Sequence, residues 1–255
     1  MIYAEYDDCT IINDDVISAL KSLPAESVHM VVTSPPYYGL RDYSIPSTYW
    51  QLHVPKRECK HERLIDGSWC TGCAAWYGTL GLEETPNDYL DHMRLVFEHV
   101  WRVLRKDGTL WLNMGDSYAG SGKGPQGESG SVGKSYWSTD EAKPGSTTKD
   151  GMHGVTWAGE DGAVKKEGMT RVGPVKGYKA KDLMMMPARL ALTLQAAGWW
   201  VRSDIIWEKP NPMPESATDR PTSSHEHIFL LTKNSKYYYD ADAIRETGAL
   251  ASGSA

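Results

Sequence analysis

Apolar residues recur at two different spacings in the first forty residues of the chain, and each spacing predicts a different element. Residues 9–12 and 28–33 are short runs of mainly apolar or β-branched residues, as in strands, whereas the segment between them repeats apolar residues at helical spacing. Asn13 or Asp14 can cap the N-terminus of that helix, and Pro24 ends it. The pattern therefore predicts a strand, a helix and a second strand.

The same two spacings alternate through the rest of the chain. A wide apolar stripe over residues 85–108 predicts a long helix, followed by a strand over 109–113. Residues 187–197 predict another helix, and residues 199–207 and 227–232 predict two more strands. Strands that alternate with helices indicate an α/β fold, in which helices cover the faces of a sheet.

Composition narrows the class of protein without identifying it. The chain has 255 residues, of which 40% are apolar and 24% charged, so it is neither disordered throughout nor collagen-like. It has no run of eighteen apolar residues and does not begin with a basic segment followed by an apolar one, which argues against a membrane span and against secretion. We expect a cytoplasmic protein with no membrane partner.

The net charge of −6 hides an uneven distribution of charged residues. Residues 1–118 carry 10 basic and 17 acidic side chains, whereas residues 119–181 carry 10 basic and 7 acidic ones. This second segment also holds 14 of the 24 glycines and shows no sustained periodicity. We expect a flexible basic loop that contacts a polyanion such as DNA, although a solvated loop without a ligand would have the same composition.

The sharpest local feature is the sequence Ser34-Pro35-Pro36-Tyr37, which directly follows the strand predicted over 28–33. In open α/β sheets, ligands bind at the edge formed by the carboxyl ends of the strands. Two consecutive prolines also occur in ordinary turns, so a turn without a ligand is the alternative. The position of the motif at a strand end favours a functional site.

Residues 31–39 (VVTSPPYYG) resemble the catalytic motif of the amino-directed DNA methyltransferases, which is Asp, Asn or Ser, then Pro-Pro, then Tyr, Phe or Trp. Residues 89–118 and 187–240 resemble the segments that follow this motif in the β-group enzymes of bacteria and phages. The resemblance implies a class I, Rossmann-like sheet. It also implies transfer of a methyl group from S-adenosylmethionine to the exocyclic amine of a base flipped out of double-stranded DNA, in DNA modification or restriction–modification, with a restriction endonuclease as a potential partner.

The chemistry of such enzymes gives each residue of the motif a role. The side chain of Ser34 and the backbone carbonyl of Pro35 would each accept a hydrogen from the amine, which frees the nitrogen lone pair for the methyl group. Pro35 and Pro36 fix φ and hold the carbonyl in place, and Tyr37 would stack on the flipped base. By the same resemblance, a serine before Pro-Pro favours cytosine N4 over adenine N6 as the target.

The resemblance assigns roles to four further residues. Asp14 would accept hydrogen bonds from the adenosine part of S-adenosylmethionine, although a helix N-cap explains the same residue equally well. Lys209, Asn211 and Arg220, which follow the strand over 199–207, would bind the flipped base or a phosphate. A proline-rich connector with solvated charges is the alternative for this loop.

Three of the four cysteines lie close together within residues 44–84, a segment without a periodic apolar pattern. Cys59, His61, Cys70 and Cys73 form Cys-x-His and Cys-x-x-Cys pairs, with the ligand types and short spacings of a structural zinc site. Three thiolates and one imidazole would complete a tetrahedron and leave no position for water. A set of free thiols is the alternative. We expect a zinc-ribbon-like insertion that the metal orders.

One element of the family is missing from the sequence. No Asp-Pro-Phe-x-Gly-x-Gly turn, the S-adenosylmethionine loop of the family, follows the last predicted strand. The methyltransferase domain, over residues 1–43, 85–118 and 182–248, would therefore be incomplete and followed by a low-information tail over 249–255. Either the chain is a fragment, or a separate polypeptide supplies the missing C-terminal half.

Two other functions remain open on the sequence alone. A methyltransferase that acts on RNA or on a protein amide would use similar chemistry, but such enzymes usually have Asn rather than Ser before Pro-Pro. The second alternative is a non-catalytic, zinc-containing fragment that binds DNA.

Overall fold

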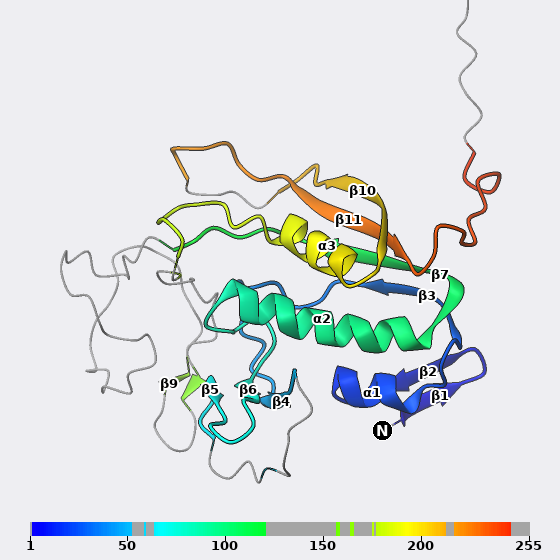
Figure 1. Cartoon of the computed structure of the whole chain (residues 1–255). Coiled ribbons are helices and arrows are strands. Elements are labelled where there is room, and N and C mark those ends of the chain that lie inside the picture. Colours follow the sequence, from blue (N-terminus) through cyan, green and yellow to red (C-terminus); the bar gives the residue numbers. More distant parts are fainter. Residues whose placement is uncertain are drawn as a thin grey trace, which may run out of the picture.

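A four-stranded mixed sheet forms the centre of the computed structural model (Figure 1). β3 (Val28–Thr33) and β7 (Leu104–Met114) are parallel, and β11 (His225–Thr232) is antiparallel to β7 on its other side. β10 (Trp200–Glu208) is antiparallel to β11, so the strand order is β10-β11-β7-β3. All four strands predicted for this sheet are confirmed, and β7 begins earlier than predicted.

The structure describes most of the chain outside the predicted basic loop. The tail over 249–255 lies outside the described residues, and so does His61. The described residues are 2–52, 59, 64–120, 157–158, 164–165, 175, 177–212 and 217–245.

Two helices cover one face of the sheet. α2 (Pro86–Val103) begins after its N-cap, Thr85, and α3 (Met186–Ala196) packs beside it (Figure 1). Neither helix, nor any other in the described residues, has the length and apolarity needed to cross a bilayer. The core contains buried side chains from α2, α3, β7 and β11, among them Met93, Phe97, Leu110, Leu112, Leu190, Leu194, Phe229 and Leu231.

The opposite face of the sheet differs from the sequence-based expectation. The alternation of strands with helices predicted helices on the faces of the sheet, but in the described residues we find α2 and α3 on one face only. On the other face, Met30 and Val32 of β3 are 57% and 70% exposed, and Trp207 of β10 is 49% exposed. A short apolar run shows that a strand can be buried, but the presence of a covering element depends on tertiary structure.

The N-terminal segment forms a separate hairpin. β1 (Ile2–Tyr6) pairs antiparallel with β2 (Cys9–Ile12), and α1 (Val16–Ser22) follows. The predicted strand is therefore confirmed, but it pairs with β1 and is not part of the four-stranded sheet. The N-cap of α1 is Asp15, not Asp14 or the residue before it, because the Asp15 carboxylate accepts from two backbone N–H groups of the first turn (3.0 and 3.1 Å).

A second, smaller sheet lies beside α2 (Figure 1). β4 (Thr48–Trp50) and β5 (Ser68–Trp69) both pair antiparallel with β6 (Trp76–Gly78), which is the middle strand. This sheet is formed by the segment over residues 44–84, in which the sequence shows no periodic apolar pattern. Its strands of two or three residues are too short to produce a recognisable alternation of apolar and polar positions.

A buried aromatic cluster joins this small sheet to α2. Trp50 and Trp76 are 4% and 1% exposed, and the imidazole of His92 stacks on Trp76 with ring centroids 5.1 Å apart. His92 Nδ1 lies 3.0 Å from the Glu83 carboxylate, and both side chains are fully buried. Burial raises the pKa of Glu83, and its hydrogen bond with His92 opposes this shift. Packing against α2 therefore helps to order the segment, in addition to any metal.

The predicted basic loop begins and ends at the same place. The backbone N–H of Ala119 donates to the carbonyl of Asp182 (2.9 Å), and the N–H of Lys181 donates to the carbonyl of Ala119 (2.8 Å). Within the loop, β8 (Trp157–Ala158) pairs antiparallel with β9 (Val164–Lys165), and most of the remaining loop lies outside the described residues.

The burial of β7 side chains in the core leads to a testable prediction about stability. Leu110→Ala should lower the free energy of unfolding by about 2–5 kcal/mol, because the side chain is fully buried in β7 and its removal leaves a cavity. Leu192→Ala is the matched control, since Leu192 of α3 is 64% exposed, and it should change the value by no more than about 0.5 kcal/mol. Denaturant unfolding measures both. Similar losses in the two variants would contradict this packing.

Candidate active site and cysteine cluster

The Ser-Pro-Pro-Tyr motif forms a corner directly after β3, at the carboxyl edge of the sheet. Ser34 is exposed, and the backbone that follows it is held from two sides. The hydroxyl of Tyr89, on α2, donates to the carbonyl of Pro36 (2.9 Å), and the N–H of Gly39 donates to the carbonyl of Gly81 (2.8 Å). The corner is therefore fixed by its prolines and by hydrogen bonds to α2 and to the segment before it.

The side chain of Tyr37 lies at the centre of a hydrogen-bond cluster. Its hydroxyl is 3.1 Å from Ser34 Oγ, donates to Glu226 Oε2 (3.1 Å) and accepts from Asn113 Nδ2 (3.0 Å). The ring lies so close to Gly115 that a Cβ there would be 2.7 Å from Tyr37 Cε2. Burial, more than any neighbouring group, raises the pKa of Tyr37 to about 12, so the phenol is neutral at physiological pH.

Glu226 is the charged member of this cluster. Its Oε2 also accepts from Asn113 Nδ2 (2.8 Å), and its Oε1 forms an ion pair with Lys209 Nζ. Burial alone would raise the pKa of Glu226, but the hydrogen bonds from Lys209 and Asn113 and the charge of Lys209 lower it overall. The carboxylate is therefore ionised at neutral pH.

Sheet topology explains why these side chains meet. β3 and β7 are parallel, so the corner after β3 lies beside Asn113 near the end of β7. β11 is antiparallel to β7 and begins at that edge, with Glu226 as its second residue, and Lys209 follows the end of β10. Sequence analysis identified Ser34 to Tyr37 and Lys209 but missed Asn113 and Glu226. The signal in the sequence that could have identified both residues is a polar residue near one end of an otherwise apolar strand.

The other predicted DNA-binding residues lie in the connection between β10 and β11. Asn211 is exposed on the loop after β10. The guanidinium of Arg220 lies over the ring of Tyr118, 3.9 Å from its centroid, and Arg220 also donates to the carbonyl of Pro221 (3.1 Å). Because Tyr118 immediately precedes the predicted basic loop, Arg220 lies at the base of that loop.

Asp14, the predicted cofactor residue, is exposed between β2 and α1. Its carboxylate accepts from the backbone N–H of Asp15 (2.9 Å). This hydrogen bond connects Asp14 to its own neighbour in the chain. An exposed carboxylate in this connection can accept hydrogen bonds from a polar ligand.

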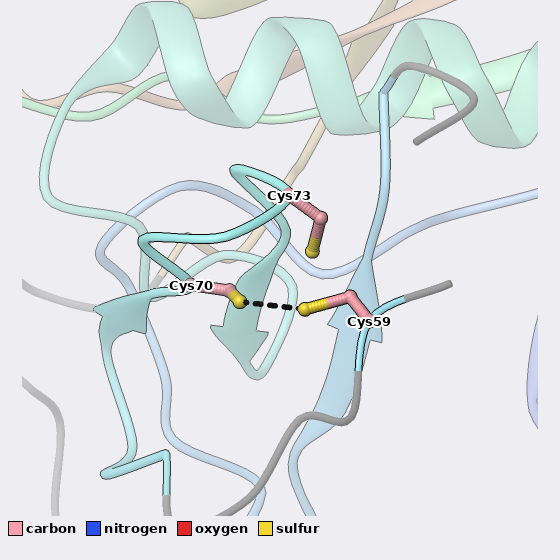
Figure 2. A group of neighbouring side chains, drawn as sticks. All are labelled: Cys59, Cys70 and Cys73. Atoms are coloured by element: carbon pink, nitrogen blue, oxygen red, sulfur yellow. Dashed lines mark hydrogen bonds between the residues drawn. The ribbon is translucent and has the colours of Figure 1, made fainter. Parts of the chain in front are cut away.

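Three cysteine side chains converge on one point (Figure 2). The Sγ atoms of Cys59, Cys70 and Cys73 all lie within 4.8 Å of one another, and those of Cys59 and Cys70 are 3.4 Å apart. In a tetrahedral zinc site with Zn–S bonds of about 2.3 Å, sulfur atoms are roughly 3.8 Å apart. The predicted fourth ligand, His61, lies outside the described residues. The three thiols thus have the spacing of a zinc site.

The turn that carries Cys70 and Cys73 leaves room for the side chain of Cys59 to approach it. The N–H of Ala74 donates to the carbonyl of Cys70 (2.8 Å), and the N–H of Cys70 donates to the carbonyl of Ala75 (2.7 Å). A Cβ on Gly72 would lie 3.1 Å from the Cys59 sulfur. Glycine at this position therefore lets Cys59 reach the turn after β5.

Sequence comparison identifies relatives over almost the whole chain. Residues 28–250 match the N6/N4 family described as DNA methylase. The type II methyltransferase M.Cfr9I of Citrobacter freundii is 36% identical over 242 residues, 95% of this chain and 60% of that protein. The type II methyltransferase M.SmaI of Serratia marcescens is 38% identical over 239 residues, 93% of this chain and 60% of that protein. The chain thus spans 60% of the length of these curated relatives.

Solved structures of two methyltransferases are also similar to this chain. The PvuII DNA methyltransferase, named as cytosine-N4-specific, aligns with a TM-score of 0.44 and 16% identity over 89% of this chain and 50% of that one. TTHA0409, a putative DNA modification methylase of Thermus thermophilus complexed with S-adenosyl-L-methionine, aligns with a TM-score of 0.43 and 17% identity over 90% of this chain and 55% of that one. On the family match and the identity to its curated relatives, the chain belongs to the DNA methylase family.

Proposed function

We propose that this protein transfers a methyl group from S-adenosylmethionine to the exocyclic amine of a base in double-stranded DNA, and that cytosine N4 is preferred over adenine N6. The observation that carries the proposal is the exposed Ser34 hydroxyl at the carboxyl edge of the sheet, in a corner braced by Tyr89. Membership of the DNA methylase family supports the reaction and the DNA substrate. The preference for cytosine rests on serine before Pro-Pro.

The corner offers two acceptors to an amine. Tyr89 occupies the carbonyl of Pro36, whereas among the described residues none donates to the carbonyl of Pro35. Ser34 Oγ and the Pro35 carbonyl oxygen would each accept one N–H of the base. An exocyclic amine is a poor nucleophile because its lone pair is delocalised into the ring, and two such hydrogen bonds draw the nitrogen towards tetrahedral geometry. The prolines hold these acceptors in place beforehand.

Tyr37 would receive the flipped base. The target atom cannot be reached inside a duplex, so the nucleotide must leave the stack. Stacking on an aromatic ring contributes about 1–3 kcal/mol per base and does not depend on which base it is. The hydrogen bonds of the Tyr37 hydroxyl and the close approach of Gly115 hold the ring in one orientation, which lowers the entropy cost of stacking.

S-adenosylmethionine, when bound, supplies the methyl group. Among the described residues we assign one contact to it, the exposed carboxylate of Asp14. The sequence holds no Asp-Pro-Phe-x-Gly-x-Gly turn, so the residues present account for only part of a cofactor site.

DNA contacts would come from the edge of the sheet. Asn211 is exposed beside the cluster residue Lys209, and Arg220 lies at the base of the basic loop, so both can meet a phosphate backbone. Lys209 is engaged by Glu226, and a direct contact with the base would have to compete with that ion pair. A restriction endonuclease partner stays a prediction, supported only by the type II names of the relatives. An RNA or protein-amide substrate and a non-catalytic role are not favoured by the family match.

Ser34→Ala tests the reaction. Removal of a hydrogen-bonding group that meets the reacting atoms should lower kcat by about 10²–10³-fold, with little change in DNA affinity. The measurement is transfer of labelled methyl groups to unmethylated DNA, followed by mass spectrometry of the nucleosides, which separates N4-methyldeoxycytidine from N6-methyldeoxyadenosine. Ser18→Ala, an exposed change in α1, is the control. Transfer by Ser34→Ala at the wild-type rate would refute the assignment.

We also propose that Cys59, Cys70 and Cys73 bind a structural Zn²⁺, with His61 as the fourth ligand. The spacing of the three sulfur atoms supports a tetrahedral site. Four protein ligands would leave no position for water, so the metal would stabilise the small sheet and take no part in methyl transfer.

Metal analysis tests this site. The double variant Cys70→Ser/Cys73→Ser should lose the roughly one zinc ion per chain expected of the wild type, and its melting temperature should fall, because the site contributes to folding. Cys9→Ser is the matched control, since Cys9 is an exposed cysteine of β2 outside the cluster. Unchanged zinc content in the double variant would show that the metal is absent or bound elsewhere.

A further inference from the structure

We propose that Glu226 is a positioning residue that sets the direction of the hydrogen bonds in the Ser34–Tyr37 pair, so that the serine meets the target amine as an acceptor. The inference rests on the proposed function and adds to it a residue outside the Ser-Pro-Pro-Tyr motif. The inference is supported by a chain of two hydrogen bonds: Ser34 Oγ is 3.1 Å from Tyr37 Oη, which is 3.1 Å from Glu226 Oε2.

The direction of the inner bond follows from the chemistry of the carboxylate. An ionised carboxylate has no proton and can only accept, and a tyrosine hydroxyl has a single proton. Glu226 is held ionised by Lys209 and Asn113. The only proton of Tyr37 is therefore directed to Glu226.

Asn113 does not accept the Tyr37 proton in place of Glu226. Its amide nitrogen has two protons, which reach Tyr37 Oη (3.0 Å) and Glu226 Oε2 (2.8 Å). The reversed amide would place Asn113 Oδ1 against the carboxylate, where two acceptors would repel each other. Asn113 therefore donates to both groups, and the remaining contact of the Tyr37 oxygen, with Ser34, must be one in which the phenol accepts.

Ser34 must then donate inward. A hydroxyl has one proton and two lone pairs, so a serine that donates to Tyr37 keeps both lone pairs for a ligand. Ser34 is exposed and can present them to the N–H groups of a base. With the opposite direction, Tyr37 would occupy one lone pair, and the Ser34 proton would point towards an amine that itself donates two hydrogens. The carboxylate thus decides whether the serine can accept from the amine.

The same arrangement also strengthens that acceptor. Hydrogen bonds in a chain polarise one another, by about 10–30% per bond. A serine oxygen whose proton is drawn towards a phenol, which is itself bonded to a carboxylate, carries more negative charge than an isolated one. Lys209 contributes indirectly, because its ion pair keeps the carboxylate charged without contact with Ser34.

Glu226→Gln tests the direction without a change of shape. Lys209 is a donor and will hold the amide oxygen of the glutamine in the place of Oε1, which puts the NH2 group in the place of Oε2, facing Tyr37. This NH2 group would also face the NH2 group of Asn113, which donates to Oε2 in the wild type, so the Asn113 amide would have to turn. The phenol would lose the charged acceptor that directs its proton away from Ser34. We expect kcat for DNA methylation to fall about 10–100-fold, less than the 10²–10³-fold loss of a group that meets the reacting atoms. The KM for DNA should stay within about twofold.

The matched control is Glu208→Gln. Glu208 is an exposed glutamate at the end of β10, the strand end from which Lys209 follows, and the same change there should leave kcat within about twofold of the wild type. Melting temperatures of both variants show whether either one affects folding.

A second variant separates hydrogen-bond direction from any structural effect. Glu226→Gln/Asn113→Asp moves the carboxylate to the other side of Tyr37, so the phenol can again donate to a carboxylate and accept from Ser34. We expect kcat to recover part of its loss. Recovery should be incomplete, because Asn113 Oδ1 is buried without a donor among the described residues, and one oxygen of the new carboxylate would take its place.

Tyr37→Phe provides an independent check, because Glu226 acts through the tyrosine. In a Tyr37→Phe background, adding Glu226→Gln should change kcat by less than about twofold, whereas independent effects would multiply. The inference is wrong if Glu226→Gln alone keeps the wild-type kcat, if the double variant with Asn113→Asp is no faster than Glu226→Gln, or if the effects multiply. Loss of activity in Ser34→Ala with none in Glu226→Gln would overturn this inference and leave the proposed function standing. An inactive wild-type protein would overturn both.

Discussion

The hydroxyl oxygen of Tyr37 is the point at which the ends of the central strands are tied together. It contacts a residue of the corner after β3, a residue near the end of β7 and a residue at the start of β11. Each of these groups has the correct donor or acceptor only because the others are present. The mixed sheet makes this possible, since two parallel strands end, and one antiparallel strand begins, at the same edge.

α2 connects this edge to the rest of the molecule. Tyr89, in its first turn, donates to the carbonyl of Pro36, and His92, one turn further on, is buried against Trp76 of the small sheet. Gly81 and Glu83 follow that sheet in the sequence. The carbonyl of Gly81 accepts from the Gly39 N–H in the corner, and the carboxylate of Glu83 is hydrogen-bonded to the His92 imidazole on α2. The segment that carries the cysteine cluster therefore braces the corner, and a structural metal there would support the candidate active site from outside.

The corner from Ser34 to Tyr37 was accessible to sequence analysis because it is local. Four consecutive residues after an apolar strand supply two candidate acceptors and an aromatic ring, and the prolines among them restrict φ, so the motif can be recognised without any distant contact. The Cys-x-x-Cys turn is local in the same sense. Asn113 and Glu226 were missed because neither is unusual in its own segment. Their importance lies in contact with Tyr37, from which Glu226 is separated by 189 positions.

The amino-acid sequence by itself determined the order of the helices and of the strands of the central sheet, the corner at the end of β3 and the spacing of the cysteines, because all of these follow from side-chain periodicity and backbone restrictions over a few residues. The tertiary structure decided that the hairpin over residues 2–12 stands apart from the central sheet, that α2 and α3 lie on one of its faces, and that a carboxylate stands behind Tyr37. These depend on which strands pair and in which direction. Hydrogen bonds and packing between distant segments settle that pairing, and no local pattern encodes them.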